Sequence, residues 1–256
     1  MRVRGVLAAL AALLTIVVGV PFGAGGAEAT PARDPVVIVA GTFAGQPAAS
    51  IFYAPMAARL RADGYQPHIF GLPTSGTQDI ALTAQALNTY ADQVRAQTGA
   101  TRVDLIGHSQ GGLVARHYVK YLGGSSEVDA LISLGAPHYG TAVANVAKLF
   151  GLGNCIGITS CVQMSIGSTY LANLNAGDDT IGAVRYTNIV SANDEVVIPY
   201  RTGWLADDGN NVNVRIQSPC FLRIVGHVGL ALDGTVYSGI QDALANRAIS
   251  LNCFAV

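Results

Sequence analysis

Ser109 lies in the pattern Gly-x-Ser-x-Gly, at the junction of a predicted strand and a predicted helix. Residues 103–106 are mainly apolar and predict a buried strand. Apolar and aromatic residues recur at helical spacing over 113–122, and Gly123 and Gly124 end the run. This order is typical of a nucleophile elbow, a tight turn that exposes the serine hydroxyl at the positive end of the helix. The alternative is a plain turn before a helix. We predict that Ser109 is a nucleophile.

A serine nucleophile needs a histidine that accepts its proton, and the chain contains five histidines. His227 lies in a glycine-flanked loop after the last predicted strand and is the preferred base. His138, in the loop that follows a predicted strand at 128–134, is the alternative; it could instead make a structural hydrogen bond below the site. The side chain of His108, next to the nucleophile, is expected to point away.

The histidine in turn needs a carboxylate that fixes its tautomer and supports its positive charge. Asp194 follows a predicted strand and precedes His227, which gives the order Ser, Asp, His along the chain. The neighbouring Glu195 is the rival, and only one of two adjacent side chains at a strand end can face the histidine. Other acidic residues are interpreted as solvated loop or turn residues: Asp178, Asp179, Asp207 and Asp208.

The turn after the first predicted strand is a candidate oxyanion hole. An unbroken β-branched run at 36–40 predicts a central strand, and it ends in the glycine-flanked turn 41–45. Backbone N–H groups at the carboxyl end of such a strand are exposed where α/β folds bind ligands. Thr42 is the predicted donor, and its hydroxyl could add a second hydrogen bond; the alternative is a simple strand-to-helix turn. The backbone N–H of Gln110 is the other predicted donor.

Strands and helices alternate along the rest of the chain. The predicted strands cover residues 36–40, 66–70, 103–106, 128–134, 186–190 and 212–216. The main predicted helices cover 51–63, 79–99, 113–122 and 235–247. This alternation predicts an α/β fold with a mostly parallel central sheet and helices on both faces. Residues 142–179 have a looser pattern, and we interpret them as a small cap, lid or pocket wall, or as ordinary packing over the sheet.

The first residues have the pattern of an export signal. Arg2 and Arg4 precede an apolar run at 6–20, and a small-residue segment ends in Ala-Glu-Ala at 27–29. This predicts a signal peptide over 1–29 that is removed. A membrane anchor is the alternative, but the apolar run is shorter than the roughly 20 residues that a membrane span requires.

The remaining residues, 30–256, suit a single domain. The chain has a net charge of −1, and only 12% of its residues are charged while 50% are hydrophobic. The absence of charge runs and of a basic helix argues against nucleic-acid partners and against a helix that binds a membrane surface. We expect a monomer.

All four cysteines follow the predicted cleavage site. In an oxidising compartment they are expected to pair, and four cysteines allow three pairings. The pairing that is local in the chain joins Cys155 to Cys161 and Cys220 to Cys253; free buried thiols are the alternative. The spacing has no zinc pattern, and we predict no metal and no cofactor.

Several motifs together resemble a known family. They are Val39-Ala40-Gly41-Thr42, Gly-His-Ser-Gln-Gly-Gly-Leu-Val, Leu-Gly-Ala-Pro-His-Tyr-Gly-Thr, Ser-Ala-Asn-Asp-Glu-Val-Val-Ile-Pro and Gly-His-Val-Gly. In this order they resemble the secreted bacterial triacylglycerol lipases of the α/β-hydrolase superfamily. The turn at Thr42 and the Asn-Asp-Glu stretch are also similar to the yeast lipase B group.

The resemblance implies a role for each matching residue: Ser109 as nucleophile, Asp194 as acid, His227 as base, and Thr42 with Gln110 as oxyanion hole. Ala40 departs from the pattern, because many bacterial lipases carry histidine there, whereas the enzymes similar to yeast lipase B also lack it. Some related lipases bind structural calcium, but the sequence contains no dense carboxylate loop and we expect no such ion.

The motifs lead to the hypothesis of a secreted serine carboxylic-ester hydrolase. Most specifically, the hypothesis is a lipase that cleaves acylglycerol esters through an acyl-enzyme on Ser109. Its expected partner is a lipid or other apolar ester substrate, with transient contact to the lipid–water interface. Enzymes with the same machinery are the alternatives: a short-chain esterase, a cutinase-like polyesterase or an acyltransferase. A binding protein on a hydrolase scaffold is a further alternative, for which a damaged triad would be expected.

Overall fold

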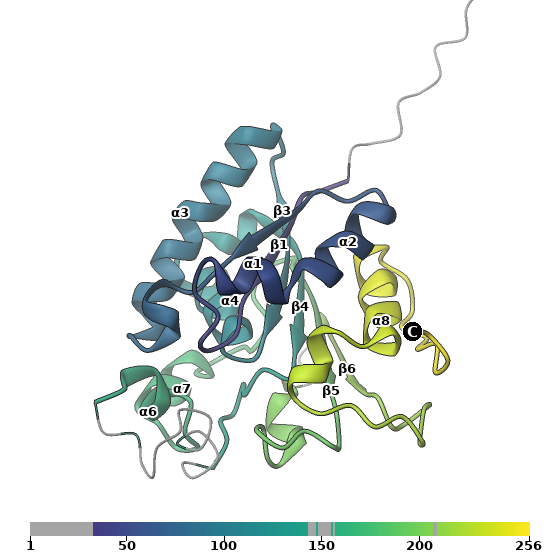
Figure 1. Cartoon of the computed structure of the whole chain (residues 1–256). Helices are drawn as coiled ribbons and strands as arrows, with labels where there is room; N and C mark the ends of the chain where they lie inside the picture. Colours follow the sequence, from purple (N-terminus) through teal and green to yellow (C-terminus); the bar gives the residue numbers. More distant parts are fainter. Residues whose placement is uncertain (1–32, 143–146, 148–154, 156, 207–208) are drawn as a thin grey trace, which may run out of the picture. The chain divides into compact units, whose positions relative to one another are not determined.

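The computed structural model describes residues 33–142, 147, 155, 157–206 and 209–256 (Figure 1). The predicted signal peptide at 1–29 lies outside the described residues. So do Asp207 and Asp208 and parts of the segment 142–179.

Six strands form one sheet in the order β2-β1-β3-β4-β5-β6. The strands are β1 (Val36–Val39), β2 (Pro67–Phe70), β3 (Val103–His108), β4 (Val128–Leu134), β5 (Arg185–Val190) and β6 (Asn211–Arg215). Each neighbouring pair is parallel. The four side chains of β1 are fully buried, as expected for an apolar strand covered on both faces. The prediction of a mostly parallel sheet is confirmed.

Helices cover both faces of the sheet, and Figure 1 shows α3 and α8 on opposite sides of the strands. The α-helices are α1 (Ala48–Phe52), α2 (Ala54–Ala62), α3 (Ile80–Thr98), α4 (Gln110–Tyr121), α6 (Thr159–Gln163), α7 (Thr169–Leu174) and α8 (Gly234–Leu244). Short 3₁₀ helices are η1 (Pro73–Gly76), η2 (Gly124–Ser126), η3 (Tyr200–Gly203) and η4 (Val228–Ala231). α3 packs on α4, and α4 packs on β3 and β4. Helix α4, which begins directly after Ser109, therefore lies against the middle of the sheet.

Two predicted helices have different ends in the structure. The predicted helix 51–63 is two helices, because Pro55 has no N–H to donate and occupies the first turn of α2. α8 ends at Leu244, before Arg247, since Asn246 adopts a positive φ of 50° and the chain turns there.

A buried ion pair ties the segment after α7 to α4. Arg116 Nη2 lies 3.0 Å from Asp179 Oδ1, and both side chains are 2% exposed. Asp179 also accepts hydrogen bonds from the Tyr139 hydroxyl and from the backbone N–H of Ala206. The interpretation of Asp179 as a solvated loop residue is therefore wrong, whereas Asp178 is exposed. The carboxylate compensates a guanidinium that the packing of α4 has removed from water.

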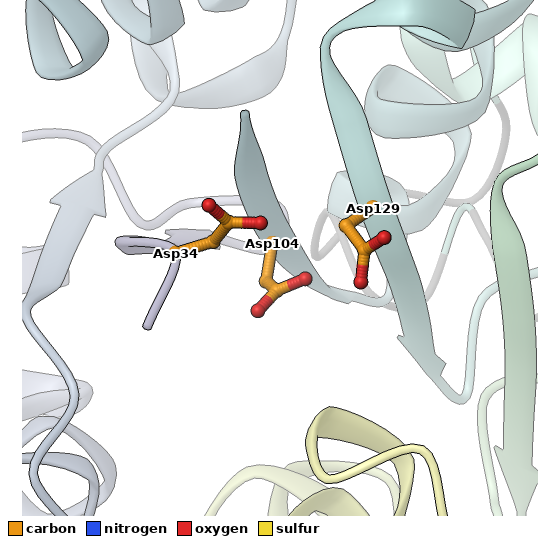
Figure 2. A group of neighbouring side chains, drawn as sticks. All are labelled: Asp34, Asp104 and Asp129. Atoms are coloured by element: carbon orange, nitrogen blue, oxygen red, sulfur yellow. The ribbon is translucent and has the colours of Figure 1, made fainter. Parts of the chain in front are cut away.

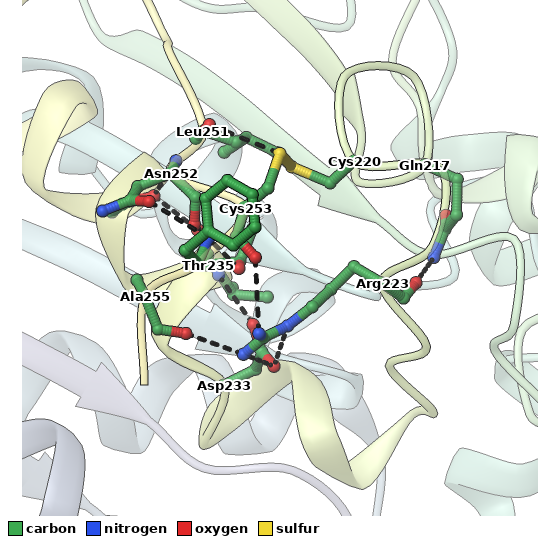
Figure 3. Close-up of a disulfide and its surroundings, with 12 residues drawn as sticks. Gln217, Cys220, Arg223, Asp233, Thr235, Leu251, Asn252, Cys253 and Ala255 are labelled. Atoms are coloured by element: carbon green, nitrogen blue, oxygen red, sulfur yellow. Dashed lines mark hydrogen bonds and ion pairs between the residues drawn. A yellow bond between two sulfur atoms is a disulfide. The ribbon is translucent and has the colours of Figure 1, made fainter.

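Both disulfides have the pairing that is local in the chain: Cys155 with Cys161, and Cys220 with Cys253. Beside the second disulfide, Arg223 donates to Asp233 at 2.7 Å and to the carbonyl of Ala255 at 2.8 Å (Figure 3). Asp233 also accepts the backbone N–H of Val236 and so caps α8. The loop between β6 and η4 is thus fixed to the C-terminal segment by a covalent bond and to the start of α8 by an ion pair.

Three carboxylates meet near the amino ends of β1, β3 and β4: Asp34, Asp104 and Asp129 (Figure 2). Asp104 is buried, and one of its oxygens accepts the backbone N–H of Ala130. Burial, followed by the charges of Asp129 and Asp34, raises the pKa of Asp104 to about 8. Asp129 is paired with Arg185 at 2.5 Å. The cluster therefore retains a proton on Asp104 at neutral pH.

The substitution Asp104→Asn is expected to flatten the pH dependence of stability. Between about pH 4 and pH 8 the native state binds a proton that the unfolded chain has released, so stability falls as the pH rises, by up to about 1.4 kcal/mol per pH unit. Asparagine keeps the acceptor for Ala130 and removes the titration. Urea unfolding at pH 5 and pH 9 measures this. The gain from Asp104→Asn should be larger at pH 9, with the exposed Asp92→Asn as control; an equal gain at both pH values contradicts the explanation.

The substitution Asp179→Ala is expected to cost about 3–5 kcal/mol of unfolding free energy, because it leaves the buried Arg116 guanidinium without its counter-ion. Chemical denaturation measures the loss. The adjacent exposed Asp178→Ala is the matched control and should change stability by no more than about 0.5 kcal/mol. Equal effects of the two variants would remove the energetic role assigned to the ion pair.

Candidate active site

Ser109 occupies a strained turn between β3 and α4. Its backbone has φ 55° and ψ −127°, a conformation that non-glycine residues rarely adopt. The turn needs glycine on both sides, because a Cβ on Gly111 would lie 2.3 Å from the carbonyl oxygen of Val39, and one on Gly107 would lie 2.6 Å from the Cα of Gly112. The sequence motif therefore reflects close backbone approach.

Three predicted side chains converge at the carboxyl end of the sheet. Ser109 Oγ lies 2.8 Å from His227 Nε2, and His227 Nδ1 lies 2.8 Å from Asp194 Oδ2. They come from the end of β3, from the loop after β5 and from the start of η4. All three are buried. The serine hydroxyl is thus within proton-transfer distance of an imidazole whose other nitrogen faces a carboxylate.

Backbone groups fix the orientation of the Asp194 carboxylate. Its Oδ1 accepts the N–H groups of Val196 and Val197, both at 2.8 Å. The other oxygen remains for the imidazole. This division of the two oxygens holds the His227 ring in the tautomer that presents Nε2 to the serine.

The rival candidates lie elsewhere. Glu195 does not face the imidazole; its Oε2 accepts the backbone N–H of His227 at 2.9 Å. His138 is fully buried, and neither of its ring nitrogens has a hydrogen-bond partner among the described residues. Burial, together with the charge of Arg116, lowers the pKa of His138 well below its ordinary value. The structure does not bring His138 to the serine.

His108 differs from the expectation that its side chain points away. Its ring lies 5.1 Å from the ring of His227, and its Nε2 is 3.0 Å from the carbonyl oxygen of His227. On its other side, Nδ1 lies 2.8 Å from the hydroxyl of Tyr53. The side chain is therefore directed toward the main chain of the candidate base, in the loop that carries His227.

The predicted oxyanion residues lie on two turns that are bonded to each other. Thr42 Oγ1 donates to the side-chain oxygen Oε1 of Gln110 at 2.8 Å, and Gln110 Nε2 donates to the carbonyl of Gly76 at 2.9 Å. Gln110 is the first residue of α4, so the helix supplies no acceptor for its backbone N–H. The hydroxyl proton of Thr42 is engaged by Gln110, and donation to a substrate oxygen would require it to exchange that bond.

A cavity of about 280 Å³ opens in front of Ser109 and His227. Besides the polar groups, its walls are apolar: Phe43, Ala44, Ala48, Phe52 and Val228. Phe43 and Val228 are also 43% and 52% exposed, so they border the entrance. The arrangement can bind an apolar group beside a serine that is activated by an imidazole.

Sequence reasoning did not identify Tyr53, Phe52 or the contact of Glu195 with the main chain. Two adjacent aromatic residues in a predicted helix are normally interpreted as core. A backbone contact leaves no signal in residue type. Nothing in the sequence could have distinguished these residues from ordinary packing.

A family model described as "Lipase (class 2)" matches residues 33–214. A protein of Pseudarthrobacter phenanthrenivorans named "Triacylglycerol lipase" is 32% identical over 105 residues, which cover 40% of this chain and 32% of that protein. "Lipase B" of Pseudozyma antarctica is 25% identical over 210 residues, which cover 80% of this chain and 59% of that protein. The chain therefore spans between a third and three fifths of the length of these relatives.

Among solved structures, Aspergillus fumigatus lipase B superposes with a TM-score of 0.71 at 19% identity, covering 85% of this chain and 54% of that chain. At this identity the likeness concerns the fold.

The variants Asp194→Asn and Glu195→Gln are expected to differ sharply in the reactivity of Ser109 toward a fluorophosphonate. Asparagine presents an N–H or a neutral oxygen to His227 Nδ1 and favours the wrong tautomer, which lowers the labelling rate constant by on the order of 10⁴. Glutamine at 195 keeps an acceptor for the His227 amide and should cost far less. Labelling kinetics followed by intact-mass spectrometry measure both. The reverse ranking would make Glu195 the acid, and no labelling of the wild type would remove the nucleophile.

Proposed function

The chain belongs to the class 2 lipase family and has the α/β-hydrolase fold, and from this premise we propose that it hydrolyses carboxylic esters with Ser109 as the nucleophile. The observation that carries the proposal is the contact sequence Ser109–His227–Asp194, with two distances of 2.8 Å, at the edge of an apolar cavity.

In the proposed reaction, Ser109 Oγ attacks the ester carbonyl while His227 Nε2 accepts its proton. Asp194 supports the positive imidazolium. The protonated His227 then donates to the departing alcohol, which leaves an acyl group on Ser109. A water molecule, activated by the same imidazole, releases the acid and restores the serine.

The negative oxygen of each tetrahedral intermediate requires hydrogen-bond donors. We assign this role to the backbone N–H groups of Gln110 and Thr42, to which the Thr42 hydroxyl could add a further hydrogen bond. A single donor of this kind is worth roughly 10²–10³ in rate. The direct bond between the two side chains supports their acting at one place, because it holds the turn after β1 against the start of α4.

The proposed substrate is an acylglycerol or another apolar ester. Phe43, Phe52 and Val228 give the cavity walls that suit an acyl chain, and the relative from Pseudarthrobacter phenanthrenivorans is named a triacylglycerol lipase. The short-chain esterase remains the second candidate, because a cavity of about 280 Å³ is at the lower end of the range for ligand pockets.

We also propose that the protein is exported and acts as a monomer at or near a lipid–water interface. Its two disulfides support an oxidising compartment, as does the signal-like pattern of its first residues. Among the described residues, none of the helices combines the length and the apolar character that crossing a bilayer demands.

Replacing Ser109 by alanine should lower ester turnover by roughly 10⁶, since the nucleophile and the acyl-enzyme are both lost. Initial rates on a soluble p-nitrophenyl ester measure this. The control is Ser126→Ala, an exposed serine in η2 at the amino end of β4, opposite the site, which should keep wild-type rates. Turnover of Ser109→Ala within tenfold of the wild type would falsify the nucleophile assignment.

A chain-length series separates the two candidate substrates. Rates on p-nitrophenyl esters from C2 to C16, and on emulsified triglyceride, should rise above the C2 rate if the apolar walls bind the acyl chain. A preference for C2 together with no hydrolysis of the emulsion would favour the short-chain esterase.

A further inference from the structure

A chain of buried hydrogen bonds joins the turn after β1 to the main chain of His227. The backbone N–H of Gly41 donates to the hydroxyl of Tyr53 at 2.9 Å. That hydroxyl lies 2.8 Å from Nδ1 of His108, whose Nε2 lies 3.0 Å from the carbonyl oxygen of His227. Tyr53 is 1% exposed and His108 is 5% exposed. Little of either side chain is accessible to water, and both also line the cavity in front of Ser109.

The chemistry of the partners fixes the direction of every bond. The carbonyl oxygen of His227 can only accept, so Nε2 of His108 carries a proton. Nδ1 of the neutral ring is then an acceptor, and the hydroxyl of Tyr53 donates to it. The Tyr53 oxygen uses a lone pair for the N–H of Gly41. This arrangement requires an uncharged His108, and burial, followed by the nearby charge of His227, lowers the pKa of His108 to about 3.

The two ends of this chain are the two parts of the site that must act on one substrate carbonyl. Gly41 directly precedes Thr42, the candidate oxyanion residue, and His227 is the candidate base. Glu195 holds the backbone N–H of His227 from the other side. Through Tyr53 and His108, the carbonyl of His227 is held by the same groups that hold the oxyanion turn.

We propose that Tyr53 and His108 are positioning residues that hold the oxyanion turn at Thr42 and the imidazole of His227 at a fixed distance and orientation relative to each other. Neither residue exchanges a proton with the substrate; they act through Gly41 and through the main chain of His227. The proposal rests on the ester hydrolysis proposed above. Misplacement of a reacting group by about 1 Å can cost 10²-fold in rate, so the relative position of these two groups matters for turnover more than for binding.

Tyr53→Phe tests the first link, because it removes only the hydroxyl and leaves Gly41 and His108 without that partner. On a soluble p-nitrophenyl ester, kcat should fall by about 10- to 100-fold while KM stays within about twofold. The matched control is Tyr118→Phe. Tyr118 is equally buried on α4, but its hydroxyl donates to Glu127, at the amino end of β4. This control should lower the melting temperature without lowering kcat.

His108 is tested by two substitutions. His108→Phe removes both ring nitrogens, and in the double variant with Tyr53→Phe the loss in kcat should be smaller than the product of the single losses. His108→Gln retains an N–H donor for the His227 carbonyl and should restore part of the kcat that His108→Phe loses. If His108→Phe does not fold, the same cycle is measured with His108→Gln.

Two results would overturn the positioning role: kcat of Tyr53→Phe within about twofold of the wild type, or fully multiplicative losses in the double variant. Ser109→Ala in the same assay keeps the two proposals apart. Activity retained in that variant overturns the proposed function. Its loss, with Tyr53→Phe unaffected, overturns only the role of Tyr53 and His108.

Discussion

The site depends on one residue, His227, whose two ring nitrogens, backbone N–H and backbone carbonyl each have a hydrogen-bond partner. The ring of His227 contacts Ser109 and Asp194, its backbone N–H contacts Glu195, and its carbonyl contacts His108. A histidine in a loop would otherwise lose rotational freedom each time it reacts. Here that entropy has been lost during folding, and it is compensated by packing elsewhere in the domain. The parallel sheet is what allows two distant segments, residues 108–109 and 194–195, to meet at this residue.

The sequence predicted the elements in which one physical cause dominates. β1 (Val36–Val39) follows from its β-branched run, and α3 from its cap at Asp79 and the left-handed Gly99 that ends it. It failed where two causes compete, as at Pro55, where helical spacing continues but a backbone donor is missing. The burial of Asp179 was also not predictable, because its partner Arg116 lies on α4, 63 positions earlier, and nothing near Asp179 in the chain identifies that partner.

For the site, the sequence located the residues whose chemistry is local to a motif. The glycines around Ser109 and the order of Asp194 and His227 sufficed to name the three side chains that the structure brings together. It did not indicate what supports them. Tyr53 and Glu195 contact main-chain atoms, and the main chain is the same for every residue type. Only the folded backbone shows which amide or carbonyl a side chain can reach.

The bond between Cys220 and Cys253 joins residues 33 positions apart and closes a ring that contains His227 and the whole of α8. All six strands precede that ring in the chain. Cross-linking such a loop stabilises the folded state by about 4 kcal/mol, mainly by restricting the unfolded chain. Breaking the bond leaves the connectivity of the sheet untouched, and in the folded state the ion pair of Arg223 with Asp233 still ties the loop before His227 to the start of α8. The oxidation state of two sulfur atoms thus changes the free energy of unfolding through the part of the chain that carries the base and none of the strands.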